Sequence, residues 1–81
     1  MSNLNHSPRA EHRPRRIFGK RLRELRMERG VSQEKLAELA DLHRNHVGVL
    51  ERGGQFASLD TICKLAHALK VKPAELLKNL P

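Results

Sequence analysis

The chain has 81 residues, enough for one small domain, and Phe18 and Phe56 are its only aromatic residues. Its net charge is +7, and all but one unit lies in residues 1–30. This favours a polyanion as partner, with charge that merely keeps the protein soluble as the alternative. One cysteine excludes an intrachain disulfide. Because there is neither an apolar run of roughly 18 residues nor a signal-peptide core, we expect a cytoplasmic protein without a membrane span.

The first sixteen residues differ in character from the rest. They are polar, show no apolar periodicity and contain two prolines. We therefore expect a disordered basic arm over residues 1–16, followed by one domain over residues 17–79.

A first helix is predicted from the spacing of Phe18, Leu22 and Leu25, which form one apolar stripe. Gly30 follows as its expected C-cap. Its basic residues lie mostly on the outer side: Lys20, Arg21, Arg23 and Arg29.

Two short helices joined by a tight turn are predicted between residues 32 and 53. Ser32 is a favourable N-cap for the first of them. Its expected inward stripe is Leu36, Leu39 and Ala40, with the small residue Ala37 at the helix crossing.

The pattern breaks at Asp41 and Leu42, resumes with Val47 and Leu50, and ends at Gly53 and Gly54. The outward residues of the second helix are then Arg44, Asn45, His46 and Gly48. This pattern is typical of a helix-turn-helix, with the motif at about residues 33–52.

Two more helices complete an all-α prediction. Ser58 caps a helix whose expected inward residues are Leu59, Ile62, Leu65, Ala66 and Leu69. Pro73 opens a final short helix that carries Leu76, Leu77 and Leu80. The fold class is thus a compact domain of five helices.

The motif and its flanking helices resemble the phage-repressor-like helix-turn-helix family, which includes lambda repressor, Cro and the controller proteins (the XRE type). The residues that carry this resemblance are Gln33, Ala37, Val47, Leu50, Glu51-Arg52-Gly53, Ser58-Leu59-Asp60-Thr61-Ile62, Leu65-Ala66-His67-Ala68-Leu69 and Pro73-Ala74-Glu75-Leu76-Leu77. The resemblance as a whole covers roughly residues 17–79. The resemblance implies the five-helix lambda-repressor-like fold and a regulator of transcription that binds double-stranded DNA.

The resemblance places the second helix of the motif, about residues 43–52, in the major groove. Arg44 can then pair with a guanine edge and Asn45 with an adenine edge, and His46 and Gly48 are further candidates for base contacts. A solvated helix face is the alternative for Arg44 and Asn45, and simple tolerance of glycine is the alternative for Gly48.

Other roles implied by the resemblance concern the DNA backbone and the support of the recognition helix. Gln33, with Ser32 and the amides at the start of its helix, is similar to the family's phosphate clamp, and Arg52 is a further phosphate candidate. Ser32 as a cap alone is the alternative. Arg26 and Glu51 are expected to form a structural ion pair that holds the recognition helix against the first helix.

Three positions depart from the family's pattern. Asp41 stands where glycine is usual in the turn, and His43, a poor cap, stands where the recognition helix usually has Ser or Thr. The loop over residues 54–57 lacks the basic residues that many relatives have. We therefore expect the arm to contribute DNA contacts through its arginines: Arg9, Arg13, Arg15 and Arg16.

The resemblance also implies a homodimer on a pseudo-palindromic operator. We expect its interface in the C-terminal region, at Val71, Leu76, Leu77 and Leu80, with completion of the core as the alternative role. Glu34 and Glu38 stand where some activating relatives meet RNA polymerase, or they belong to a solvated face. By size, restriction–modification controller proteins match best, and phage repressors and antitoxins follow. A protein-interaction module of the same fold is the rival from another class.

No catalytic, cofactor or small-molecule site is expected. We find no nucleophile–base set, phosphate loop or carboxylate pair in the sequence. The spacings of Cys63 with His67 and of His43 with His46 do not supply a four-ligand zinc site. We therefore predict neither an enzyme nor a metalloprotein.

Overall fold

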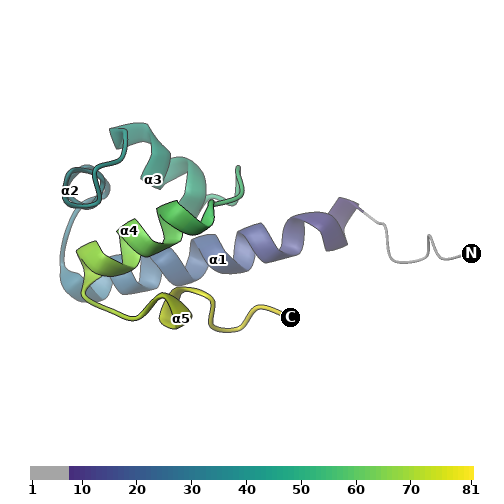
Figure 1. The fold of residues 1–81 in the computed structure, drawn as a ribbon. Helices are drawn as coiled ribbons and strands as arrows, with labels where there is room; N and C mark the ends of the chain where they lie inside the picture. Colours follow the sequence, from purple (N-terminus) through teal and green to yellow (C-terminus); the bar gives the residue numbers. More distant parts are fainter. Residues whose placement is uncertain (1–7) are drawn as a thin grey trace, which may run out of the picture.

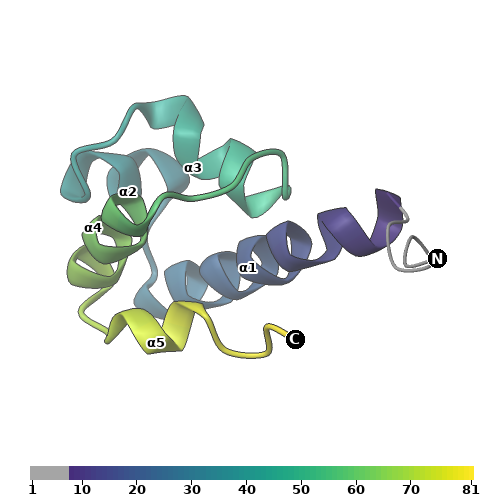
Figure 2. The same cartoon turned by 45° about the vertical axis from the view of Figure 1, so that its right-hand side comes forward.

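The computed structural model describes the backbone of residues 8–81 and the side chains from residue 13 onward. Over this range the chain forms helices only, in the order α1 (Pro8–Arg29), α2 (Gln33–Leu39), α3 (Arg44–Glu51), α4 (Leu59–Leu69) and α5 (Pro73–Leu76). The long rod α1 carries α2 and α3 on one side and α5 on the other, with α4 between them (Figures 1 and 2). None of the described helices is long and apolar enough to cross a membrane.

The predicted serine caps begin α2 and α4. The Lys35 backbone N–H donates to Ser32 Oγ at 2.9 Å, and the Thr61 N–H donates to Ser58 Oγ at 3.1 Å. Each bond satisfies a donor that the first turn of a helix leaves without a partner. Both predictions are confirmed.

The turns between helices use left-handed backbone where the sequence indicated it. Gly30 after α1 has φ +73°, and Asp41 between α2 and α3 has φ +57°. Aspartate tolerates this conformation better than most residues that carry a Cβ, so it can replace the usual glycine here.

The core lies where α1, α2, α3 and α4 meet and is aliphatic except for Phe18. Its fully buried large side chains are Leu22, Leu36, Leu50, Leu65, Leu69, Leu76 and Val47. Two residues predicted to face inward are exposed instead: Leu39 by 49% and Leu59 by 73%. The core face of α2 is centred on Leu36, Ala37 and Ala40, so Leu39 falls beside it. Leu59 is the first residue of α4 and lies at the edge of that helix's stripe.

The first helix is longer than predicted. It begins at Pro8, earlier than the start near Ile17 that the sequence predicts, and residues 1–7 lie outside the described range, so the arm stays a prediction there. Contacts with a distant loop hold the helix at Arg15 and Arg16. The Arg15 guanidinium lies 4.7 Å from the centre of the Phe56 ring, and Arg16 packs against Gly53. Such contacts leave no periodicity in the sequence.

The short α5 is tied to the rest of the domain by its last residue and by an ion pair. Leu76 is fully buried, so its predicted role in a dimer interface is wrong and its alternative role in the core holds. On the outer side, Arg21 Nη2 of α1 lies 2.8 Å from Glu75 Oε1. Leu77 remains partly exposed, and Val71 and Leu80 are half-buried.

Candidate nucleic-acid interface

Helices α2 and α3 form the predicted helix-turn-helix. The chain turns between them through Asp41, and the Leu42 N–H donates to the Ala37 carbonyl oxygen at 2.8 Å. Ala37 is the small residue at the crossing, and its size lets the two helices approach closely. Both Ala37 and Val47 are buried as a result. The outer side of α3 is thereby left open.

The start of α3 has a cap that the sequence interpretation judged poor. His43 Nδ1 accepts a hydrogen bond from the Asn45 backbone N–H at 3.2 Å, so its ring nitrogen takes the place of the usual hydroxyl. The helix begins at Arg44. The cap fixes the first turn, from which the candidate base-contacting side chains project.

The side chains of Arg44 and Asn45 are exposed and that of His46 is half-buried, as expected for an outward face. They do not form one row. Arg44 lies toward α2, where it lines a shallow hollow together with Ser32 and Glu34. Asn45 and His46 line a different hollow on the other flank of α3. The helix thus offers two adjacent surfaces, one on each flank.

Gly48 differs from the prediction. It is buried, and a Cβ built on it would lie 3.1 Å from Arg52 Nη1 and 3.3 Å from Gln33 Oε1. The expectation that Gly48 faces outward is therefore wrong. Residue 48 lies one turn after Arg44 on the side of α3 that faces the start of α2. Glycine there leaves room for the two long polar side chains.

Two residues on the open face were missed. Val49, half-buried, and Gln55, exposed, line the same hollow as Asn45 and His46. Val49 lies four residues after Asn45 and so shares its face, which helical spacing could have revealed. Gln55 had no local signal, because the loop after α3 folds back only in the tertiary structure.

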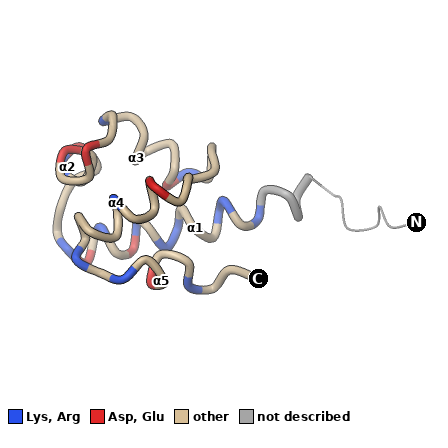
Figure 3. Tube along the Cα trace, in the orientation of Figure 1, with Lys and Arg blue, Asp and Glu red and all other residues tan. Residues whose placement is uncertain are grey.

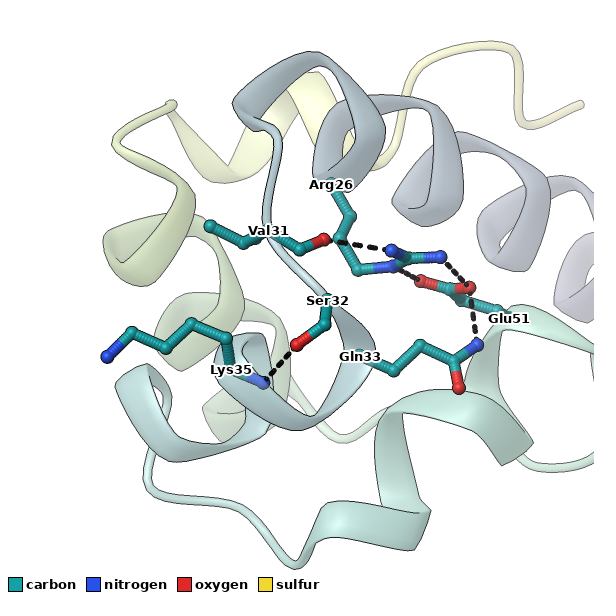
Figure 4. Close-up of polar contacts among 6 residues, drawn as sticks. All are labelled: Arg26, Val31, Ser32, Gln33, Lys35 and Glu51. Carbon is teal, nitrogen blue, oxygen red and sulfur yellow. Dashed lines mark hydrogen bonds and ion pairs between the residues drawn. The ribbon is translucent and has the colours of Figure 1, made fainter.

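A buried polar network holds α3 in place (Figure 4). Arg26 Nε donates to Glu51 Oε2 at 2.6 Å, and Arg26 Nη2 donates to Glu51 Oε1 at 3.1 Å, which confirms the predicted pair. Gln33 Nε2 donates to the same Oε1 at 2.9 Å. One carboxylate therefore joins α1, α2 and α3. The side chain of Glu51 is 3% exposed and that of Arg26 is 13% exposed.

The surroundings of Arg26 keep it charged. Its hydrogen bonds to Glu51 and the carboxylate charge raise the pKa of the Arg26 guanidinium, although burial acts in the opposite direction. Its remaining Nη1 donates to the Val31 carbonyl oxygen at 2.9 Å. Three of the five N–H donors of the guanidinium are thus used inside the protein, which supports a structural role.

The candidate phosphate residues surround this network. Gln33 gives one amide hydrogen to Glu51 and is half-buried, and Ser32 is exposed at the start of α2. Arg52, just after α3, is exposed. Basic residues recur along α1, and acidic residues gather on α2 (Figure 3). No group of three or more potential metal ligands occurs among the described residues.

Comparison with known proteins relates this geometry to proteins of known type. A helix-turn-helix family model (HTH_3) matches residues 22–76. Control protein C.BamHI of Bacillus amyloliquefaciens is 45% identical over 64 residues, which cover 78% of this chain and 79% of the relative. The cryptic phage CTXphi transcriptional repressor RstR of Vibrio cholerae is 35% identical over 63 residues, covering 78% of this chain and 57% of the relative.

A solved structure agrees in fold as well as in sequence. The restriction-modification controller protein C.AhdI from Aeromonas hydrophila superposes with a TM-score of 0.75 at 53% identity, over 76% of this chain and 94% of that one. With its α2–α3 pair, its buried Arg26–Glu51 link and these likenesses, the chain belongs to the helix-turn-helix family that includes the controller proteins and phage repressors.

Proposed function

We propose that this protein is a transcriptional regulator that binds a specific double-stranded DNA site through α3. The observation that carries the proposal is the rigid presentation of exposed side chains. Arg44 and Asn45 project from the first turn of a helix that is capped at one end and anchored at the other by the buried Glu51 carboxylate. Such pre-organisation is what base readout by short side chains requires.

The chemistry of the exposed face suits the major groove. Arg44 can donate two hydrogen bonds to guanine, and Asn45 can donate to and accept from adenine; each such pair discriminates by roughly 1–3 kcal/mol. His46 and Val49 lie beside them and would contact base edges or a thymine methyl group. Gly48, covered by its neighbours, is left out of the readout.

Backbone contacts would fix the helix in register. We assign these to Ser32 and Gln33 at the start of α2, to Arg52 after α3, and to Arg13 and Arg16 of α1. We do not assign a backbone contact to Arg15, because its guanidinium is stacked on Phe56.

A single copy reads too little DNA to be specific in a genome. The eight residues of α3 extend about 12 Å, which corresponds to roughly four base pairs, and this supports two copies on a pseudo-palindromic site with half-sites about 34–36 Å apart.

The dimer surface we favour is apolar. Leu77, Leu80 and Phe56 border a hollow that reaches Phe18, and Phe56 is 70% exposed.

Control of transcription could follow by occlusion or by contact with RNA polymerase. Glu34 and Glu38 are both exposed on α2, and Glu34 lies near Arg44, at the edge of the proposed DNA surface. A polymerase bound next to the operator could meet them there. The controller-protein likeness favours a transcriptional regulator of that type over an antitoxin.

Selection of bound duplexes from a random pool tests the proposal. We expect a consensus with two-fold symmetry and a strong preference for it over a scrambled duplex. Equal binding to all duplexes, or no binding, would contradict it and would favour a protein-interaction module of the same fold.

A further inference from the structure

A row of basic side chains runs along the outer face of α1. Its members are Arg13, Arg16, Lys20 and Arg23, and all four are exposed. Their spacings of three, four and three residues place them on one side of the helix. Ten residues of α-helix extend about 15 Å, so this basic row is long enough to follow several phosphates. Basic residues along α1 are visible as blue segments in Figure 3.

The charge of the basic row is not used inside the protein. Within the part of the chain that the structure describes, its four side chains make no ion pair or hydrogen bond. Two other basic residues of α1 behave differently. Arg21 pairs with Glu75 and Glu24, and Arg26 pairs with Glu51. The carboxylate of Glu24 is thereby held on the side of Arg21.

The basic row begins beside the far end of the recognition helix. Arg16 packs against Gly53, the residue that follows Arg52, and the backbone at Gly19 approaches the carbonyl oxygens of Leu50 and Glu51. A groove that receives α3 is bounded by a phosphate backbone at each side. If a phosphate backbone passes Arg52, the side of α1 that carries Arg16 is the neighbouring basic surface.

We propose that the basic row is a second, sequence-independent contact with the DNA backbone, which extends the footprint beyond the bases that α3 reads. The inference rests on the proposed function. It adds Lys20 and Arg23, which the sequence analysis placed on the outer side of the helix without assigning them a role. It also gives Arg15 a positioning role: stacked on Phe56, Arg15 holds the early turns of α1 against the loop after α3 and so keeps Arg13 and Arg16 in line.

The magnitude follows from counterion release. Each neutralised phosphate contributes about 0.9 to the slope of log K against log salt. Removing three contacts should lower that slope by about 2.7, so the affinity lost between 50 and 200 mM salt should shrink by about 40-fold.

The test compares two triple variants that lose the same charge. One carries Arg13→Gln, Lys20→Gln and Arg23→Gln; Arg16 is kept because it packs against Gly53. The control carries Lys64→Gln, Lys72→Gln and Lys78→Gln, exposed positions on and around α4 and α5. Circular dichroism would confirm that both fold. Binding would be measured by fluorescence anisotropy as a function of salt, on a scrambled duplex as well as on the selected site.

We expect the slope to fall by two to three in the first variant and to change little in the control, on both duplexes, while the preference for the selected site is retained. Equal slopes in the two variants would overturn the basic row as a backbone contact. If the unmodified protein bound the selected and the scrambled duplex equally well, that result would instead overturn the proposed function. The scrambled duplex still tests the basic row in that case.

Discussion

Glu51 should be the most sensitive polar position in the domain. Its carboxylate accepts two hydrogen bonds from Arg26 and one from Gln33, at 2.6 to 3.1 Å, and its side chain is 3% exposed. In Glu51→Gln the volume is kept, but one acceptor oxygen becomes a donor that faces other donors. Removing one partner of a buried pair costs about 3–5 kcal/mol, because the remaining charge is left without compensation.

That cost is large for a domain of this size. Stabilities of about 0.05–0.15 kcal/mol per residue give roughly 4–12 kcal/mol for 81 residues. A loss of about 3 kcal/mol should therefore lower the midpoint of thermal unfolding by about 12–24 °C. The measurement is urea and thermal unfolding followed by far-ultraviolet circular dichroism, because the chain has no Trp or Tyr for fluorescence.

Glu75→Gln provides the matched control. Glu75 also pairs with an arginine of α1, at 2.8 Å, but its side chain is 47% exposed. An exposed pair contributes about 0–1 kcal/mol, so this variant should unfold almost as the unmodified protein does. If the two variants lost similar stability, and that loss stayed below about 1 kcal/mol, the idea that burial makes the Glu51 network decisive would be refuted.

Three other substitutions should separate packing, capping and assembly. Gly19→Ala would bring a Cβ into close conflict with the Leu50 carbonyl oxygen, so we expect a loss of about 1–3 kcal/mol in urea unfolding; unchanged stability would contradict the close approach of α1 and α3. Ser58→Ala should lower the free energy of unfolding by about 1 kcal/mol in the same measurement, and Ser58→Gly should lower it less. Unchanged stability in Ser58→Ala would contradict the role of the cap. Leu77→Glu should weaken dimerisation in analytical ultracentrifugation, since Leu77 borders the proposed dimer surface and is 37% exposed; an intact dimer would place the interface elsewhere.

Local signals in the sequence were sufficient for the frame of the domain. Ser32 and Ser58 as caps, Gly30 and Asp41 as left-handed turns, and the apolar periodicity of each helix all depend on neighbours within one or two turns. Such interactions are visible in the order of residues. The family resemblance then supplied the Arg26–Glu51 pair, which no local pattern indicates.

The errors arose where distant contacts decide. The part of α1 before Ile17 is contacted at Arg15 and Arg16 by Phe56 and Gly53, which lie some forty residues away along the chain. Gly48 is covered by Gln33 and Arg52 because its side of α3 faces α2, and the sequence does not show which side of a helix faces its neighbour. Helical periodicity shows which face of a helix is apolar, but it does not fix where that face ends. Residues at the edge of the apolar stripe, such as Leu59, are therefore easily assigned to the wrong side.

The account depends most directly on base readout by the first turn of α3. Arg44→Ala should be compared with the unmodified protein on the selected duplex and on duplexes that carry each single base-pair change. We expect affinity for the selected site to fall by about 1–3 kcal/mol and discrimination to be lost at one position in each half-site, with the other positions unaffected. An equal loss of affinity on every duplex, or no loss on any, would show that Arg44 does not read a base and would contradict the central claim.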